Sequence, residues 1–157
     1  MAIDPNDIDR LTPPELVTLA DPPASKEECI EFLLDIAVDA GRVDDREQAL
    51  ADLLKREEEA TTGVGMGIGI PHAKTAAVSR PSVVFARSED GIDFDAMDEK
   101  PAHLLFMLIV PAEGGDEHLE ILSSLSRALM HEEVRESLRT AESVEGVRTA
   151  LKEAVSG

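Results

Sequence analysis

The feature that most constrains this fold is an uninterrupted apolar segment, Leu104 to Val110, within AHLLFMLIVP. A strand without polar alternation cannot keep one face in water, so such a run is typical of a strand that is covered on both faces. The segment is too short to cross a membrane, which takes about 20 apolar residues, and it ends in proline. We therefore expect helices on both sides of this strand and no insertion into a membrane.

Two amphipathic helices are predicted before the strands. SKEECIEFLLDIAVDAG begins with Ser25 and Glu28 at the spacing of a capping box and ends on a glycine. DDREQALADLLKREEEA is a second helix, capped by Asp44 or Asp45, with Arg56 in its last turn. The apolar positions expected to face the core are Ile30, Leu33, Leu34, Ala37 and Val38 in the first helix and Ala49, Leu50, Leu53 and Leu54 in the second.

The remaining elements complete an α/β pattern. Strands are expected at Gly67–Ile70 and Ser82–Arg87, with an edge strand at Leu16–Leu19 and a short hairpin segment at Ile92–Phe94. GGDEHLEILSSLSRALM, HEEVRESLRTA and SVEGVRTALKEAV follow as helices. In the first of these, the core positions are Leu119, Ile121, Leu122, Leu125 and Leu129. The order of elements predicts a single α/β domain over residues 1–157, with helices on both faces of its sheet.

The chain is strongly acidic, with 33 Asp and Glu residues against 15 Lys and Arg and a net charge of -18. This charge repels nucleic-acid phosphates and argues against DNA or RNA as a partner. The composition resembles that of halophilic proteins, because the Debye length falls to about 3 Å in 1 M salt and repulsion between carboxylates is then screened. An ordinary acidic domain is the alternative.

Cysteine usage favours a reducing compartment. The single cysteine, Cys29, cannot form an internal disulfide, and MAIDPNDIDRL has none of the features of a cleavable secretion signal. We therefore expect a cytoplasmic protein. Cys29 lies among apolar residues of the first predicted helix, which favours a buried, inert thiol.

The segment GMGIGIPHAKT, residues 65–75, raises the question of a phosphate-binding loop. A Walker loop requires glycines where Ile68 and Ala73 stand, and no frame of the dinucleotide fingerprint ends in glycine. Lys74 and Thr75 then match the Walker pattern by coincidence. Both nucleotide-loop interpretations fail on these positions.

The alternating glycines of this segment instead indicate an extended chain with one bare face. They stand at positions 63, 65, 67 and 69, where the missing side chains would let another backbone, a side chain or a ligand approach closely, and we interpret them as clearance for a docking partner. Pro71 is expected to end the strand and to make the backbone after it rigid. His72 would then stand at the end of the strand with an imidazole that a partner can reach. A histidine that only makes a loop hydrogen bond is the alternative.

Two stretches of the chain resemble a known family. LLKREEEATTGVGMGIGIPHAKT and GIDFDAMDEKPAHLLFMLIVPAEGGDEHLEILSSLSRAL are similar to the enzyme IIA domain of the phosphoenolpyruvate-dependent sugar phosphotransferase system, in its fructose, mannitol and nitrogen-regulatory type. The similarity extends from about Leu16 to Leu151. The family fold is a single-domain mixed β-sheet flanked by helices, in agreement with the order of elements above.

The resemblance implies a phosphocarrier. His72 corresponds to the histidine that accepts a phosphoryl group from HPr, on Nε2, and passes it to a cysteine of enzyme IIB, which works with the membrane protein IIC. His118 matches the second active-site histidine, and Arg56 matches an arginine at the mouth of the site. Neither a metal nor a cofactor is implied. Ala73 and Gly69 depart from residues that are frequent in the family, and neither change removes a functional group.

The same resemblance leaves two functions open. One is sugar uptake through a fructose-type enzyme IIB, and the other is a nitrogen-regulatory protein whose phosphorylation controls binding to partner proteins. HPr docking is expected to use apolar contacts around His72, from Ile70, Met66 and Ala76, because steering by charge is weak at high salt.

The other polar candidates are assigned structural or surface roles. His103 and His131 have no partner at metal-ligand spacing. A zinc site from His72, His118 and an acidic residue lacks a supporting motif.

The acidic composition predicts stability that depends on salt. We expect the unfolding temperature to rise by about 10 °C, or about 3 kcal/mol for a domain of this size, as KCl increases from about 0.1 M to about 2 M. Thermal unfolding followed by circular dichroism measures this shift. Full stability in dilute buffer would show that the charge is not an adaptation to salt.

Overall fold

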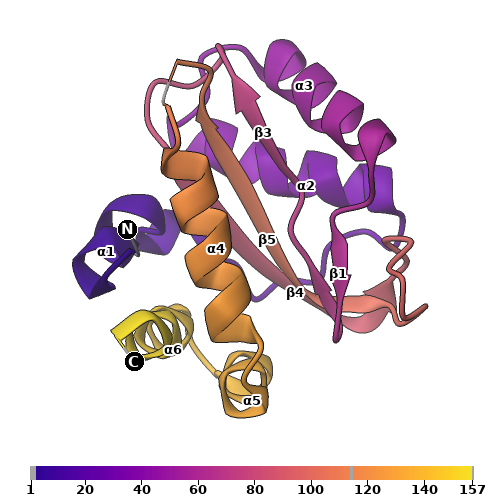
Figure 1. Cartoon of the computed structure of the whole chain (residues 1–157), viewed down its shortest axis with the longest axis vertical. Helices are drawn as coiled ribbons and strands as arrows, with labels where there is room; N and C mark the ends of the chain where they lie inside the picture. Colours follow the sequence, from indigo (N-terminus) through magenta and orange to yellow (C-terminus); the bar gives the residue numbers. More distant parts are fainter. Residues whose placement is uncertain (1–2, 114, 157) are drawn as a thin grey trace.

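The central strand of the sheet is β5 (Ala102–Pro111) in the computed structural model of the protein, which describes residues 3–113 and 115–156 (Figure 1). β4 (Ser82–Ile92) pairs with β5 in antiparallel orientation. β2 (Ile68–Gly69) and β3 (His72–Thr75) pair with it in parallel orientation, and β1 (Gly63–Gly65) pairs antiparallel with β2. The sheet is therefore mixed, as expected.

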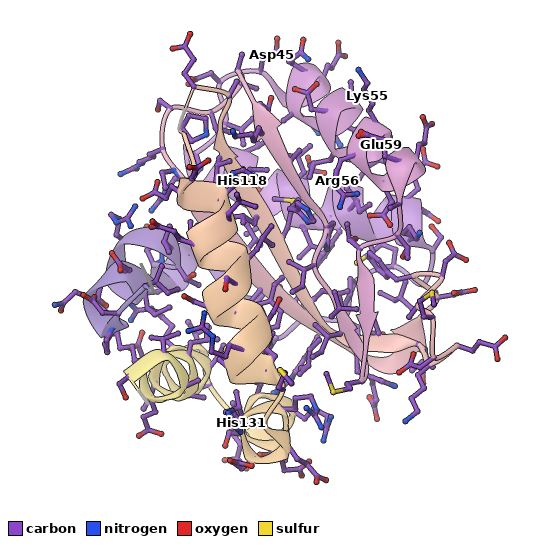
Figure 2. The ribbon with its side chains drawn as sticks, viewed as in Figure 1. Asp45, Lys55, Arg56, Glu59, His118 and His131 are labelled. Carbon is purple, nitrogen blue, oxygen red and sulfur yellow. The ribbon has the colours of Figure 1, made fainter. Side chains whose placement is uncertain are left out.

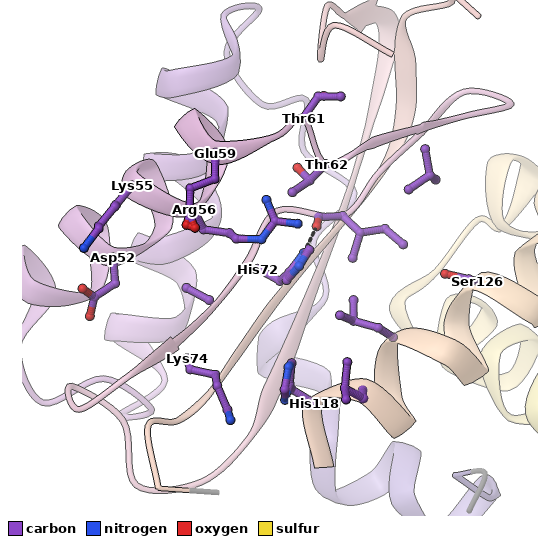
Figure 3. Close-up of a pocket in the computed structure, with 15 residues that line it drawn as sticks. Asp52, Lys55, Arg56, Glu59, Thr61, Thr62, His72, Lys74, His118 and Ser126 are labelled. Carbon is purple, nitrogen blue, oxygen red and sulfur yellow. Dashed lines mark hydrogen bonds between the residues drawn. The ribbon is translucent and has the colours of Figure 1, made fainter. Parts of the chain in front are cut away.

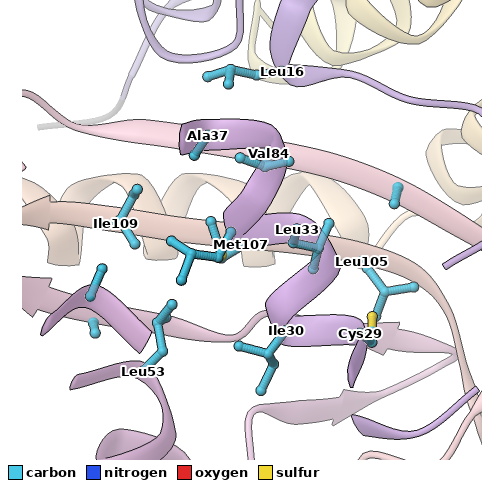
Figure 4. Packing of buried hydrophobic residues seen from close by; sticks show 14 of the residues in the cluster. Leu16, Cys29, Ile30, Leu33, Ala37, Leu53, Val84, Leu105, Met107 and Ile109 are labelled. Atoms are coloured by element: carbon cyan, nitrogen blue, oxygen red, sulfur yellow. The ribbon is translucent and has the colours of Figure 1, made fainter. Parts of the chain in front are cut away.

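Both faces of β5 are buried, which confirms the expectation drawn from its apolar run. Leu105, Met107 and Ile109 pack against α2 (Lys26–Asp39) and α3 (Arg46–Glu59), as Figure 4 shows for part of this cluster. The alternate residues of the strand point to the other face. There they pack against helices from both ends of the chain: α1 (Pro5–Leu11), α4 (Glu117–Leu129), α5 (Glu132–Thr140) and α6 (Val144–Ser156).

Figure 1 shows α4 crossing one face of the sheet and α2 crossing the other. The predicted α/β architecture with helices on both faces is thus confirmed. Among the described residues, no helix combines the length and the apolar character needed to cross a membrane.

The predicted helix starts are confirmed by their caps. The Ser25 hydroxyl accepts a hydrogen bond from the backbone N–H of Glu28, and the Asp45 carboxylate accepts one from the N–H of Gln48. Arg56 lies in the last turn of α3, as expected. These caps satisfy backbone donors that have no partner within the helix.

The N-terminal region differs from the prediction. Residues Pro14–Leu16 form a 3₁₀ turn, and the expected edge strand at Leu16–Leu19 is reduced to one bridge from Val17 to Phe85. Proline fixes φ and lacks an N–H, so Pro13 and Pro14 favour the turn over a ladder. The unpredicted α1 packs beside α6 (Figure 1). Between these helices the Asp9 carboxylate accepts a hydrogen bond from Arg148 and pairs with Lys152.

The glycine-rich segment is a tight hairpin and not a continuous extended strand. Gly65, Met66 and Gly67 all have positive φ, of 88°, 57° and 79°, and form the turn between β1 and β2. Gly63 lies against the chain's own Phe94, since a Cβ there would stand 2.9 Å from the Cβ of Phe94. The expected close approach is thus confirmed at Gly63, but the neighbour belongs to the same chain, and the interpretation as clearance for a docking partner is wrong: these glycines permit a turn and an internal contact.

Pro71 interrupts the sheet without ending it. Its carbonyl accepts a hydrogen bond from the N–H of Leu108 at 3.0 Å, and the parallel ladder continues from His72, which lies beside Leu108. The predicted strand end is confirmed for β2, which stops at Gly69, but the chain stays beside β5 and a new strand, β3, begins directly after the proline. His72 is consequently the first residue of a strand.

Candidate functional site

A hollow of about 740 Å³ lies where α3, α4 and β3 meet. Arg56, His72 and His118, which the sequence places far apart, all line it (Figure 3). Arg56 comes from the end of α3, His72 from the start of β3 and His118 from the start of α4. The structure thus brings together the three residues that the sequence analysis selected.

The imidazole of His72 is oriented by a backbone hydrogen bond. Its Nδ1 lies 2.7 Å from the carbonyl oxygen of Ile70, two residues earlier in the chain (Figure 3). A carbonyl oxygen only accepts hydrogen bonds, so Nδ1 carries the proton in this arrangement. Nε2 then keeps a free lone pair and is the nucleophilic nitrogen of a neutral ring.

Burial lowers the pKa of His72 below its usual value, because it disfavours the charged imidazolium. The positive charge of Arg56 and the nearby His118 also lower this pKa, while the hydrogen bond to Ile70 and the carboxylate of Glu57 oppose the shift. A lowered pKa keeps the ring neutral near pH 7. The site therefore presents a nucleophile that needs no base to deprotonate it.

The guanidinium of Arg56 points toward His72 (Figure 3). Its Nη1 donates to the carbonyl of Ala60 at 2.9 Å, and no carboxylate in the described part of the chain forms an ion pair with it. Its remaining N–H groups are thus available to an anion in the hollow. A guanidinium fork of this kind suits phosphoryl oxygens and stays charged at any working pH.

His118 lies at the second position of α4, on the other side of the hollow from Arg56 (Figures 2 and 3). Its Nδ1 is buried and has no hydrogen-bond partner among the described residues. The first turn of a helix favours negative charge close to it. His118 and Arg56 therefore flank the space next to His72.

Lys74 is a lining residue that the sequence analysis dismissed. In β3 the half-buried His72 and the exposed Lys74 alternate with the buried Ala73 and Thr75, so the two polar side chains share a face. No described carboxylate pairs with Lys74. The sequence signal for this was the separation of His72 and Lys74 by two positions, which places both side chains on one face of a strand. The signal was missed because no strand was predicted after Pro71.

The apolar surface around the hollow differs from the expected one. Ile70 lines the hollow as expected but is only 2% exposed, while Met66, which is exposed, and Ala76 do not line it. Val64 and Leu119 are exposed instead, at 50% and 55%, and both line it. Leu119 was expected in the core, but it lies on the side of α4 that faces the hollow.

The other candidates have structural or surface positions, as predicted. His103 Nδ1 lies 3.0 Å from the carbonyl of Ser88, and His131 lies beyond the opposite end of α4 from His118 (Figure 2). Cys29 is fully buried, and burial raises the pKa of its thiol to about 12. In the described ranges, no cluster of His, Cys, Asp and Glu has the arrangement of a metal site.

Residues 10–154 match the model of the phosphoenolpyruvate-dependent sugar phosphotransferase system EIIA 2 family. The chain belongs to this family. It is 67% identical over 153 residues to the PTS system fructose-specific EIIA component of Haloferax volcanii, covering 98% of this chain and 99% of that one. The fold of this EIIA 2 family member resembles nitrogen regulatory protein IIA-Ntr of Neisseria meningitidis, with a TM-score of 0.81, 33% identity and coverage of 92% and 98%.

A second solved EIIA structure agrees. IIA mannitol of Escherichia coli is 31% identical, with a TM-score of 0.75 and coverage of 87% of this chain and 96% of that one. Structures named for nitrogen regulation and for mannitol therefore share one fold with this chain. This protein is a component of the phosphotransferase system built on that fold.

The buried environment of the EIIA site predicts a specific titration of His72. We expect its protonation midpoint to lie below the ordinary histidine value of about 6.5 and to rise in Arg56→Gln, because a nearby positive charge is removed. Since the unfolded chain binds the proton more readily, the resulting stability is present above the unfolded pKa and is lost as pH falls through the native pKa. Imidazole NMR signals followed against pH measure the midpoint.

Arg127→Gln is the matched control for this titration. It removes the same charge from an exposed position on α4 that does not line the hollow. We expect this variant to leave the midpoint of His72 unchanged. A midpoint that stays the same in Arg56→Gln would contradict the described electrostatics.

Proposed function

We propose that this protein is a phosphocarrier, which accepts a phosphoryl group on His72 from phospho-HPr and passes it to a cysteine of a fructose-type enzyme IIB. The observation that carries the proposal is a neutral imidazole, with its Nε2 lone pair free, beside the unpaired guanidinium of Arg56. The identity of 67% with the fructose-specific EIIA of Haloferax volcanii favours fructose as the sugar class.

The first transfer is an exchange between two imidazoles. The lone pair of His72 Nε2 attacks the phosphorus of the donor's phosphohistidine, and a new N–P bond forms as the donor's N–P bond breaks. The bonding electrons return to the donor ring, which leaves as a neutral imidazole. The Nδ1 proton stays on His72, and the Ile70 carbonyl stabilises the positive charge that develops on the ring.

The second transfer regenerates the carrier. A cysteine thiolate of enzyme IIB attacks the same phosphorus, an S–P bond forms, and the N–P bond to His72 breaks. Nε2 recovers its lone pair and needs no proton. Arg56 and His118 lie where they can donate to the phosphoryl oxygens in both steps, so their role is electrostatic positioning.

The surface around the hollow suits protein partners that approach one after the other. Val64 and Leu119 give exposed apolar contacts beside His72, and such contacts persist in salt that screens charge. We place the protein in the cytoplasm, where HPr and the exposed domains of the transporter would meet it. An EIIABC relative of Bacillus subtilis, 43% identical over 122 residues, supports a IIB partner through its name, as does the solved complex of mannitol IIA with phosphorylated IIB.

A nitrogen-regulatory role is the second candidate. The chain is 32% identical over 142 residues to a nitrogen regulatory protein of Bradyrhizobium diazoefficiens, and its fold matches IIA-Ntr. In that role phosphorylation of His72 would change the affinity for a partner protein and would move no sugar. The fructose-specific relative is more similar and covers more of the chain, which favours transport.

Incubation with phosphorylated HPr tests the proposal. We expect one acid-labile phosphate on the wild-type protein and none on His72→Ala, because the nucleophile is lost. Arg56→Gln and His118→Ala should each accept phosphate about 100-fold more slowly, the cost of removing one positioned donor. Intact-mass spectrometry of quenched samples measures the uptake.

His131→Ala is the control for loss of an unrelated histidine, and we expect it to match the wild type. Subsequent addition of a fructose-type enzyme IIB should remove the phosphate within the same experiment. Phosphate on His72→Ala would overturn the assignment of the acceptor. Stable phosphate that IIB does not remove would favour the regulatory candidate.

A further inference from the structure

Glu57 is a nearly buried carboxylate directly after Arg56, and its side chain is only 7% exposed. It does not line the hollow, so it cannot touch a phosphoryl group there. Its oxygens are nevertheless fully engaged. Oε2 accepts from the Thr62 N–H at 2.9 Å and from Lys26 Nζ at 3.0 Å, and Oε1 accepts from the Thr62 hydroxyl.

The bonds to Thr62 continue through the backbone to the phosphoryl acceptor. Thr62 is buried, and its carbonyl accepts a hydrogen bond from the N–H of Ile70 at 2.9 Å. The carbonyl of the same Ile70 holds Nδ1 of His72 at 2.7 Å. An unbroken series of hydrogen bonds thus runs from the Glu57 carboxylate to the ring of His72.

We propose that Glu57 is a positioning residue for phosphoryl transfer, which acts through Thr62 and Ile70 to hold the His72 ring with Nδ1 protonated and Nε2 free. This inference rests on the proposed function. A carboxylate accepts charge-assisted hydrogen bonds that are stronger than neutral ones, so it is well suited to fix Thr62. Orientation of a nucleophile is a large part of what such a transfer requires.

The partners of Glu57 argue against a role limited to an ion pair. Lys26 is also bonded to Asp95 at 2.9 Å, so it has a second carboxylate. Each carboxylate oxygen of Glu57 accepts a hydrogen bond from Thr62, one from its backbone N–H and one from its hydroxyl. The two bonds together fix both the backbone and the side chain of Thr62. A carboxylate whose only role was the ion pair with Lys26 would not need the two hydrogen bonds from Thr62.

Arg56 and Glu57 hold the same connection between α3 and β1. Arg56 donates to the carbonyl of Ala60, while Glu57 accepts from Thr62 two residues later. In Figure 3 Thr61 and Thr62 of this connection lie above His72, close to the guanidinium of Arg56. Adjacent residues of one helical turn therefore set the place of the guanidinium and the place of the imidazole together.

The test measures the ring of His72 directly. In ¹⁵N-labelled wild-type protein, long-range ¹H–¹⁵N correlations should show a single tautomer protonated at Nδ1. Glu57→Gln keeps the shape but loses one acceptor, so we expect a mixture of tautomers and phosphate uptake about 10-fold slower at saturating phospho-HPr, with the half-saturating concentration little changed. Loss of stability alone would not move the tautomer signals of folded protein.

Three variants complete the design. Glu58→Gln removes the same charge from the exposed neighbouring position, outside the hollow, and should match the wild type in both measurements. Thr62→Val removes the hydroxyl donor and keeps the N–H, so it should shift both measurements in the direction of Glu57→Gln. Thr62→Ser restores the hydroxyl and should return both toward wild type.

The inference is overturned if Glu57→Gln and Thr62→Val retain the wild-type tautomer and rate, or if Glu58→Gln changes them as much as Glu57→Gln does. Failure of the proposed function would look different, because the wild-type protein itself would then take up no phosphate. The tautomer signals of the unphosphorylated protein still test the positioning role in that case.

Discussion

Burial of β5 on both faces is the constraint from which the arrangement of this protein follows. Seven consecutive apolar residues, Leu104 to Val110, lie in the core, which requires one helical layer on each side. α2 and α3 form one layer, and α4 with its neighbours forms the other. β3 pairs with the edge of β5 between these layers, so His72 emerges where α3 brings Arg56 and α4 brings His118. The site is a consequence of how the central strand is covered.

The chemistry of that site depends on keeping one imidazole neutral in a strongly acidic protein. The net charge of -18 would favour protonation of an exposed histidine, but His72 is half-buried and close to Arg56, and both effects lower its pKa. The hydrogen bond to Ile70 selects the tautomer of His72. Glu57 in turn holds Thr62, whose carbonyl accepts a hydrogen bond from the N–H of Ile70. Burial of His72 and the nearby charge of Arg56 therefore outweigh the hydrogen bond to Ile70 and the negative charge of the surface as a whole.

Much of this organisation could be predicted from the sequence, where local signals agree with tertiary contacts. The sequence correctly predicted the central strand from its apolar run, the helix starts at the Ser25 and Asp45 caps, and the place of Arg56 in the last turn of its helix. β3 was missed because its pairing depends on β5, far along the chain, while Pro71 gives a local signal for a strand end. The partners of Glu57 and the exposure of Leu119 depend on which faces the folded chain brings together, which helical periodicity alone does not specify.

The central claim is that Ile70 fixes His72 with Nδ1 protonated, so that phosphorus is carried by Nε2. The most direct test is a ¹⁵N and ³¹P NMR spectrum of the protein phosphorylated by phospho-HPr, in which coupling to phosphorus identifies the bonded nitrogen. The account predicts phosphorus on Nε2 of His72, with the proton retained on Nδ1. Phosphorus bonded to Nδ1 would contradict it.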